Sequence, residues 1–346
     1  MKKLYTLLAL VLALCMLAAC GKTAPAASST DVPAQTSAPT QAPAPATPAP
    51  TEAPAPSTPE PTEDRSVTVT DMTGREIRLE EPAERIVALT ASDCEILFAI
   101  GAGDKLVGRG EYCDYPAEVF NVPSVQSGYD TNIEQIIALQ PQVLLMSTMA
   151  QTDEQVAQLE AAGVHVVVSD AQDIEGVYTA IQNIGALMGK SENADKIVAE
   201  MKEGFADLAA RAAGGEQEGK TVYFEVSPLE WGLWTAGKGT FMNEIAEMLG
   251  LKNCFDDVDG WAGISEEQVL ERNPDYIVTI TMYFGEGPTP EEEIMSRPGW
   301  GEVTAVANHA ILNLQNNELS RPIPRLLDGA QMLFDFVTAE QAEKAA

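Results

Sequence analysis

The segment 191–214 constrains the fold of this chain more than any other stretch of its sequence. Its apolar residues recur every three or four positions and would form one stripe along an α-helix. The stripe consists of Ala194, Ile197, Val198, Met201, Phe205, Leu208, Ala209 and Ala212. A helix of this length spans roughly 35 Å, about the width of a small domain. Because strand and helix patterns lie on both sides of it, we expect a rigid helix that joins two lobes.

Local features define the ends and the polar side of this helix. Ser191 is a favourable cap for the first turn, and Gly214 is typical of the residue that follows a helix. Two oppositely charged pairs have the four-residue spacing that stabilises helices: Glu192 with Lys196, and Asp207 with Arg211.

Residues 66–190 alternate between strand and helix patterns. A hairpin is expected first, with strands 67–70 and 76–79 around Met72–Gly74. The elements expected after it are strand 85–89, helix 93–100 capped by Ser92, a strand ending near Gly108, helix 133–139, strand 143–146, helix 154–162 and strand 164–168. Short loops between alternating strands and helices predict a mainly parallel sheet covered by helices on both faces.

Residues 215–346 repeat the same order of elements. The expected elements are strand 222–226, helix 241–249, helix 266–272, strand 276–280, strand 309–314 and a closing helix 325–337. Within the repeat, Glu134-Gln135-Ile136 with Pro141 corresponds to Glu267-Gln268-Val269 with Pro274. The sequence therefore predicts an α/β fold of two similar lobes with mainly parallel sheets, joined by one long helix. A ligand cleft is expected between the lobes, where the carboxyl ends of both sheets face each other.

The first residues have features of export rather than of a folded domain. Lys2 and Lys3 precede a short apolar run that ends in Leu17-Ala18-Ala19-Cys20, as in a leader peptide. This ending resembles the bacterial lipobox, in which the cysteine is lipidated and becomes the mature N-terminus. We expect a leader at 1–19, a lipid on Cys20 and a location at the outer face of the cytoplasmic membrane.

Residues 20–65 are expected to form a disordered tether. Ala, Pro, Thr and Ser dominate this segment, which holds half of the chain's 22 prolines. Such a composition cannot bury enough apolar surface to offset the entropy lost on ordering.

Charge, cysteines and histidines exclude several kinds of partner and site. The formal net charge of −31 argues against nucleic acids and anionic membrane surfaces as partners. Cys94, Cys113 and Cys254 lack metal-ligand spacing; one disulfide is compatible with export, but buried free thiols are favoured. His165 and His309 each begin an apolar strand pattern and are expected to be structural. No resident metal or cofactor is therefore expected.

Catalytic motifs are missing from the sequence. It contains no nucleophile elbow, zinc signature or histidine-based triad. Segment 232–239 partly resembles a phosphate-binding loop, but Gly239 stands where a Mg²⁺-binding hydroxyl belongs and Trp234 would crowd the loop. A glycine-rich turn before helix 241–249 is the better interpretation. The chain is not expected to be an enzyme, although an extracytoplasmic enzyme using Asp93 or Asp170 stays an alternative, as does a surface adhesin.

Aromatic and amide side chains dominate the loops expected at the cleft. They are Tyr112, Tyr115, Tyr129, Trp231, Trp234, Trp261 and Tyr283, with Asn316, Asn317 and Arg321 after the last strand. Trp231, Trp234 and Trp261 lie in predicted loops, where amphipathic rings mark a binding surface more often than a core. Tyr115, next to Pro116, is expected to be a core residue instead.

From about Arg85 to Phe336 the chain resembles the substrate-binding proteins of ABC importers for vitamin B12, ferric siderophores and haem. The resemblance rests on Arg85–Leu89, Asn132–Glu134 and Ile264–Leu270. Within that family, the loop Tyr112–Pro116 and the ending Ser320–Arg325 are most similar to the cobalamin-binding branch. The resemblance implies a monomeric binding protein that delivers its ligand to a permease dimer with a cytoplasmic ATPase.

The resemblance also implies a ligand and a set of binding residues. Tyr112 and Trp261 would pack on a corrin ring, while Asn317 and Arg321 would hydrogen-bond its amides or nucleotide tail. The remaining expected ligand-binding residues are Tyr129, Trp231 and Trp234. Ferric catecholate siderophores would require several arginines, whereas these loops offer mainly Arg321 and Arg109. A flat corrinoid rimmed by neutral amides suits aromatic faces, amides and one arginine better; a ferric siderophore or haem stays the alternative ligand.

Glu134 and Glu267 occupy matched places in the first turns of corresponding helices. A carboxylate there interacts favourably with the helix dipole, which is reason enough for its presence. Proteins of the family are thought to dock through such a glutamate pair onto arginines of the permease. The resemblance therefore implies that both glutamates contact the permease.

Overall fold

The structure is a computed structural model that describes residues 64–128, 130–148, 152–315 and 317–344, all within the compact unit Thr62–Ala346. The expected leader, Cys20 and most of the expected tether lie outside the described residues, as does Tyr129. None of the helices in the described ranges combines the length and the apolar character needed to cross a membrane.

The first lobe contains a fully parallel sheet with strand order β5-β4-β3-β6-β7. Its strands are β3 (Ile86–Ala88), β4 (Leu106–Gly110), β5 (Ser124–Val125), β6 (Val143–Met146) and β7 (His165–Val168). Its helices are α2 (Ala91–Ala99), α3 (Ile133–Ala138), α4 (Asp153–Ala161) and α5 (Ile174–Leu187), with 3-10 turns η1 (Gly103–Lys105) and η2 (Ala117–Asn121). Along β6, Val143 and Leu145 belong to one buried cluster, and Leu144 and Met146 to another. Both faces of the sheet are therefore covered, as parallel sheets require.

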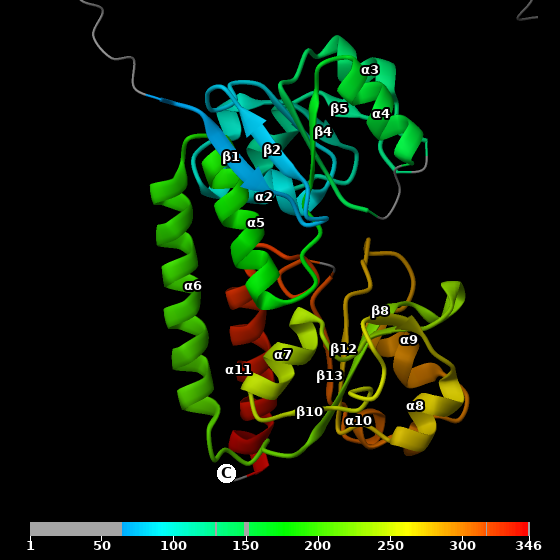
Figure 1. The fold of residues 1–346 in the computed structure, drawn as a ribbon. Helices are drawn as coiled ribbons and strands as arrows, with labels where there is room; N and C mark the ends of the chain where they lie inside the picture. Colours follow the sequence, from blue (N-terminus) through cyan, green and yellow to red (C-terminus); the bar gives the residue numbers. More distant parts are fainter. Residues whose placement is uncertain (1–63, 129, 149–151, 316, 345–346) are drawn as a thin grey trace, which may run out of the picture. The chain divides into compact units, whose positions relative to one another are not determined.

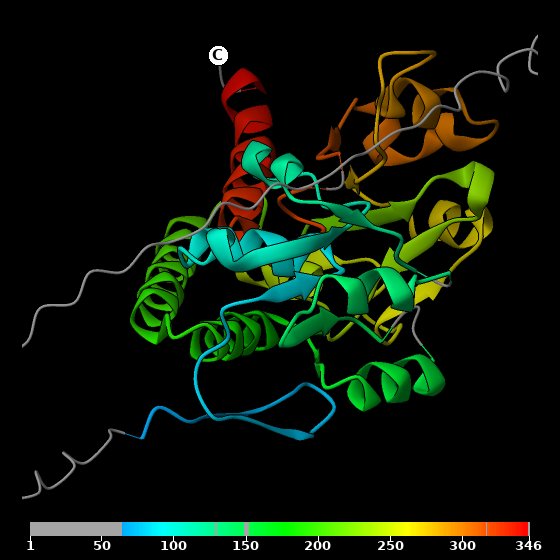
Figure 2. The same cartoon turned by 90° about the horizontal axis from the view of Figure 1, so that it is seen from above.

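The predicted hairpin is confirmed by β1 (Val67–Thr70) and β2 (Glu76–Leu79), which pair antiparallel. It lies at the rim of the first lobe (Figure 2). The amide of Asn183 in α5 donates a hydrogen bond of 2.8 Å to the carbonyl of Thr70. The hairpin is thus a separate two-stranded sheet held against α5.

The second lobe has a mixed sheet with order β11-β9-β8-β12-β13, and β10 pairs with β8. Its strands are β8 (Thr221–Ser227), β9 (Trp234–Ala236), β10 (Lys252–Asn253), β11 (Trp261–Gly263), β12 (Tyr276–Thr279) and β13 (Ile311–Asn313). Its helices are α7 (Phe241–Met248), α8 (Glu266–Arg272), α9 (Pro290–Ser296), α10 (Thr304–Ala307) and α11 (Leu326–Lys344), with turns η3 (Leu229–Trp231) and η4 (Trp300–Glu302). The order β3-β6-β7 in the first lobe matches β8-β12-β13 in the second, all parallel. This match confirms the two similar α/β lobes. The second sheet is mixed because β9 pairs antiparallel with both β8 and β11.

The predicted connecting helix is α6 (Ser191–Ala212), 22 residues long. Figure 1 shows it running alongside both lobes, next to α5 of the first and α11 of the second. Gly204 allows the close approach of α11, because a Cβ atom built there would lie 2.4 Å from a methyl group of Leu327. The buried stripe follows the prediction, although Ile197 and Ala209 are only half-buried. The connection between the lobes is therefore packed along its length.

Several local expectations were wrong. Lys190, not Ser191, occupies the cap position of α6, and no side chain caps it. Lys196 pairs with Glu200 at 3.7 Å rather than with Glu192. Helix α2 begins earlier than expected, because Thr90 instead of Ser92 accepts the hydrogen bond from the Asp93 amide. Ser191 and Ser92 lie within the first turns of α6 and α2, so neither hydroxyl occupies the cap position. The Asp207–Arg211 pair is confirmed at 3.4 Å.

Candidate functional site

Two of the expected ligand-binding aromatics project into solvent at the carboxyl ends of the sheets. Tyr112 follows β4 and Trp231 ends η3, just after β8. Each residue is 78% exposed, so that its amphipathic aromatic side chain is open to solvent. Both side chains are therefore accessible at this edge. The expected glycine-rich turn before α7 is also confirmed, since Gly239 has a φ of +80° and Thr240 caps the helix.

Trp234 and Trp261 lie in strands, which corrects their placement in loops. They belong to the antiparallel pair β9–β11, with Trp261 opposite Ala236 and Gly263 opposite Trp234. Trp234 is 46% exposed. The ring of Trp261 is half-buried and lies 5.3 Å from that of Phe241, measured between centroids. Trp261 is therefore partly a core residue.

Trp261 also joins the two lobes. Its indole N–H donates a 2.7 Å hydrogen bond to the side-chain oxygen of Gln172, which follows β7 in the first lobe. The Gln172 carbonyl accepts from the backbone amide of Phe241 at 2.8 Å, and Glu244 in α7 accepts from the amide of Ile174 at 2.8 Å. The start of α5 is thus bonded to the start of α7 beside Trp261.

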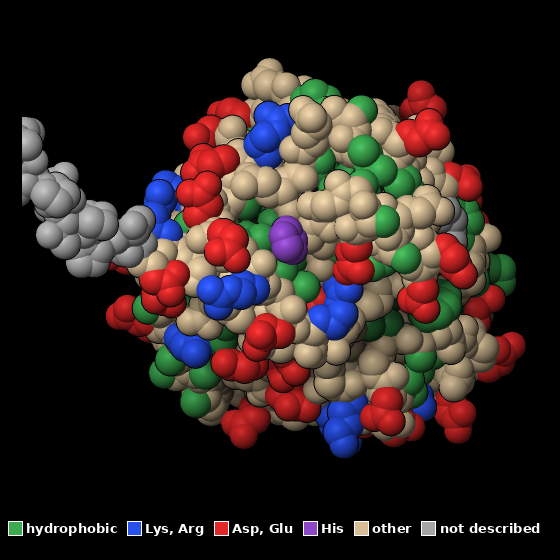
Figure 3. Space-filling model, turned by 45° about the horizontal axis from the view of Figure 1, so that its top comes forward, with side chains coloured by type: hydrophobic (Ala, Val, Ile, Leu, Met, Phe, Trp, Pro, Cys, Tyr) green, Lys and Arg blue, Asp and Glu red, His purple; other side chains and the backbone are tan. Residues whose placement is uncertain are grey.

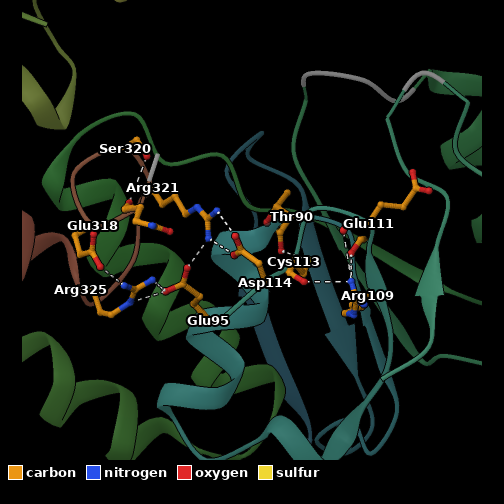
Figure 4. A network of polar contacts seen from close by, with 12 residues as sticks. Thr90, Glu95, Arg109, Glu111, Cys113, Asp114, Glu318, Ser320, Arg321 and Arg325 are labelled. Atoms are coloured by element: carbon orange, nitrogen blue, oxygen red, sulfur yellow. Dashed lines mark hydrogen bonds and ion pairs between the residues drawn. The ribbon is translucent and has the colours of Figure 1, made fainter. Parts of the chain in front are cut away.

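A second connection between the lobes is a network of charged groups that we call the interlobe clamp, made by Glu95, Asp114, Glu318, Arg321 and Arg325 (Figure 4). Glu95 belongs to α2 and Asp114 to the loop after β4, whereas the other three follow β13. Arg321 donates to Glu95 at 2.9 Å and to Asp114 at 2.7 and 3.1 Å. Arg325 donates to Glu95 at 2.9 and 2.7 Å and also pairs with Glu318. Glu95 therefore accepts hydrogen bonds from both guanidinium groups.

The interlobe clamp changes the interpretation of Arg321 and Tyr115. Arg321 is only 8% exposed, and its donors bind carboxylates of the protein instead of standing free for a ligand. Tyr115 is 45% exposed and not a core residue, because its ring lies 3.8 Å from the Arg325 guanidinium and forms a cation–π contact. Asn317, the neighbouring expected ligand residue, is half-buried, and its carbonyl accepts from the amide of Ser320 at 3.2 Å.

The charges of the clamp stabilise each other's ionised forms. Burial alone would raise the pKa of Asp114, but the hydrogen bonds and positive charge of Arg321 outweigh it and hold this pKa below its usual value. Burial alone would lower the pKa of Arg321. The hydrogen bonds to Asp114 and Glu95 outweigh this effect, so the pKa of Arg321 is raised above its usual value. Both groups are therefore charged at neutral pH, and the clamp weakens only in acid, as Asp114 becomes protonated.

Asp93, considered above as a catalytic carboxylate, is fully buried. Its pKa is raised to about 6, mainly by burial and also by the charge of Asp170, against the lowering effect of hydrogen bonds with Thr90 and Ser169. The Thr90 hydroxyl donates to the Asp93 carboxylate at 2.6 Å. A solvent-borne substrate cannot reach this carboxylate in the structure.

The raised pKa of Asp93 predicts a pH-dependent stability. The neutral acid is favoured in the folded state, so its contribution is fully present below about pH 4 and is lost as the pH rises through 6. We expect Asp93→Asn to remove up to about 3 kcal/mol of this dependence, measured by urea unfolding between pH 4 and pH 8. Asp104→Asn serves as the control, because Asp104 is exposed and is not among the groups that shift the pKa of Asp93. An unchanged pH profile in Asp93→Asn would contradict the assignment.

Glu134 and Glu267 are the second residues of α3 and α8, and both are exposed. Asn132 caps α3 and Ser265 caps α8, and each accepts from the amide three residues further on. In Figure 1 both helices lie on the side of their lobes away from α6. The pKa of Glu267 is lowered, chiefly by its hydrogen bond with Ser265. The two carboxylates thus occupy equivalent, accessible places in the two lobes.

Sequence patterns missed some residues of this region. Phe284 and Met282, in the loop after β12, are 80% and 47% exposed, and only their neighbour Tyr283 was noted. Glu95 was missed because a single acidic residue in a helix gives no sign of a partner more than 200 positions later in the chain. The three cysteines Cys94, Cys113 and Cys254 are buried thiols, as expected.

Comparison with known proteins places this architecture in a family. The family model described as periplasmic binding protein matches residues 86–318. The uncharacterized ABC transporter substrate-binding lipoprotein YvrC of Bacillus subtilis is 34% identical over 275 residues, which cover 78% of this chain and 85% of the relative.

Two solved structures have the same fold and appreciable sequence identity. One is described as a possible iron-binding, periplasmic solute-binding protein from Staphylococcus epidermidis, with 31% identity, a TM-score of 0.62, and 74% of this chain and 99% of the other covered. The other is the periplasmic vitamin B12-binding protein of Vibrio cholerae, with 26% identity, a TM-score of 0.63, and coverage of 75% and 98%. The chain therefore belongs to the periplasmic binding protein family, as a substrate-binding component of an ABC importer.

Proposed function

We propose that this protein captures a corrinoid outside the cytoplasm and delivers it to an ABC permease. The ligand would lie between the lobes, at the carboxyl ends of the sheets. Tyr112 would contact it from the first lobe, and Trp231, Trp234 and the exposed Phe284 from the second. Large flat aromatic faces match the flat faces of a corrin ring. The proposed site also includes Tyr129, Asn317 and Trp261. Trp261 would contact the ligand with the part of its ring that is not buried.

The choice of ligand rests on whether two arginines are free to bind an anionic ligand or are bonded within the protein. Arg321 pairs with Glu95 and Asp114. Arg109 is 8% exposed and donates to the carbonyls of Gly110 and Cys113 at 3.1 Å each. Both arginines that the sequence offered to an anionic ligand are therefore bonded within the protein. A ligand with neutral amides fits such a site better than a highly charged ferric catecholate.

Relatives support this proposal and also a second candidate. The Vibrio cholerae protein binds vitamin B12, according to its name, and the Staphylococcus epidermidis protein is named as a possible iron-binding protein. The exposed hydroxyl of Tyr112 favours haem as the alternative, because a tyrosine oxygen can serve as an axial ligand of haem iron. A corrinoid would use the aromatic face of Tyr112, whereas haem iron would use its hydroxyl oxygen.

Calorimetry distinguishes the candidates. We expect cobinamide or cyanocobalamin to bind, and a ferric catecholate siderophore and haemin to bind poorly. Trp231→Ala should weaken corrinoid binding by about 1–3 kcal/mol without changing the melting temperature, because the ring is 78% exposed. Trp231→Phe should restore most of the affinity, since it retains an aromatic face.

Tyr112→Phe tests the role of the hydroxyl group. A corrinoid site should retain its affinity, because the aromatic face remains. A haem site should lose the visible spectrum of tyrosine-ligated iron. Tight haemin binding that depends on the Tyr112 hydroxyl, with no heat from any corrinoid, would overturn the proposal in favour of haem.

The proposed anchorage is a lipid on Cys20, with residues 20–65 as a tether. Acidic side chains outnumber basic ones, with 52 Asp and Glu against 21 Lys and Arg, and they are spread over the face shown in Figure 3. Such a surface is repelled by anionic lipid headgroups. Attachment through the lipid chain, at the end of a long tether, is compatible with this repulsion.

A further inference from the structure

Two buried cysteine thiols meet beside the interlobe clamp. Cys94 lies in α2 and Cys113 in the loop after β4, with 0% and 1% exposure. The Cys113 thiol donates to the carbonyl of Thr90 at 3.2 Å, and the Cys94 thiol to that of Ala88 at 3.8 Å. Ala88 is the last residue of β3 and Thr90 caps α2, so the two carbonyls are only two residues apart. Both sulfur atoms are thus held against one segment of backbone.

Cys113 lies beside Cys94, because the Thr90 carbonyl that accepts from the Cys113 thiol also accepts from the backbone amide of Cys94 at 3.3 Å. A hydrogen bond with Cys113 is the main reason why the pKa of Cys94 is raised, followed by burial and by the charges of Cys113 and Asp93, with Arg109 acting in the opposite direction. Figure 4 shows Cys113 between Thr90 and Asp114. Cys254 differs, because no cysteine is among the groups that shift its pKa.

We propose that Cys94 and Cys113 form a disulfide bond in the exported protein. Two S–H bonds are replaced by one S–S bond, and the two electrons and two protons pass to the disulfide of an extracytoplasmic thiol oxidoreductase, which becomes a dithiol. Burial and a raised pKa make a thiol unreactive. The exchange therefore takes place during folding, before the loop after β4 closes over α2.

The neighbours of the two cysteines give this bond a role beyond stability. Cys94 directly precedes Glu95, and Cys113 lies between Tyr112 and Asp114. A disulfide would hold the Tyr112–Asp114 segment against α2 and fix the two carboxylates that bind Arg321. It would thereby limit the motion of the loop that presents Tyr112, whichever ligand binds there.

Differential alkylation tests the proposal. The full chain is exported through its own leader, denatured without reductant and treated with iodoacetamide. We expect Cys254 to be modified while Cys94 and Cys113 are recovered as one linked peptide pair, which separates after reduction. Cys254 is the internal control, because it follows β10 in the second lobe, whereas Cys94 and Cys113 both belong to the first. Modification of all three cysteines would overturn the proposal.

A stability measurement gives an independent readout. Reduction should lower the melting temperature by roughly 5–10 °C, because the bond closes a loop of about 20 residues in the unfolded chain. The double variant Cys94→Ser with Cys113→Ser should melt at the same temperature with and without reductant, and Cys254→Ser should behave like the wild type. A melting temperature of the exported wild type that does not respond to reductant would also overturn the proposal. Neither readout depends on the ligand.

Discussion

Replacing Glu95 by glutamine is expected to destabilise the folded unit by about 3 kcal/mol. Glu95 is 4% exposed and accepts hydrogen bonds from both Arg321 and Arg325. Glutamine has almost the same shape but no charge, so each guanidinium loses one buried counter-charge. This loss of stability is near the lower end of the range for breaking a buried ion pair, because Asp114 still binds Arg321 and Glu318 still binds Arg325.

The same substitution should weaken ligand binding. The interlobe clamp holds the loop after β4 against the segment after β13, and the ligand proposed to lie between the lobes would contact both. Additional freedom in the free protein must be lost again on binding, which reduces affinity. Urea unfolding and calorimetry measure the two effects separately.

A matched control is available in the same lobe. Glu160→Gln removes a carboxylate from an ion pair with Arg75 of 3.1 Å, but Glu160 is 48% exposed at its side chain. Exposed pairs contribute about 0–1 kcal/mol, so this variant should remain close to the wild type. Equal, small effects of both substitutions would show that the clamp does not hold the lobes.

Removing Glu134 and Glu267 together is expected to abolish uptake, or to reduce it sharply, while ligand affinity is unchanged. The two exposed carboxylates occupy equivalent positions in α3 and α8 of lobes that share one architecture. A homodimeric permease presents two identical patches related by a two-fold axis. Matched acidic groups on such a protein can meet basic groups on both subunits, which speeds association and fixes the register.

The control for this experiment must preserve the effect of the helix dipole. Glu154 and Glu291 are likewise second residues of helices, in α4 and α9. The variant Glu154→Ala with Glu291→Ala should therefore transport normally in cells that import the ligand. Normal uptake by the Glu134→Ala, Glu267→Ala variant at native expression would leave those two glutamates with a role in helix stability only.

Much of the fold followed from local sequence patterns, as the second lobe illustrates. Helix α8 and strand β12 were expected at 266–272 and 276–280, and they lie at Glu266–Arg272 and Tyr276–Thr279. Capping residues, apolar periodicity and a proline between the two elements carry this information locally. Helix α5 was not among the expected elements, although Asp173 caps it and its buried residues recur at helical spacing. Strands β9 and β11 were also missed, since Gly237 directly follows the first and Gly260 directly precedes the second, and glycine is typical of turns.

The sequence by itself determined the α/β class, the duplicated lobes, the connecting helix and the exposed aromatic rings at the ends of the strands. These features depend on residues that are neighbours in the chain. Only the tertiary structure decided that Arg321 binds Glu95 and Asp114, that Trp261 bonds to Gln172, and that Cys113 lies beside Cys94. The physical reason is that the free energy of a charged or polar group depends on partners that folding brings close. The positions of two residues along the chain do not reveal whether folding brings them together. Arg321 therefore has the same neighbours in sequence whether it binds a ligand or the opposite lobe.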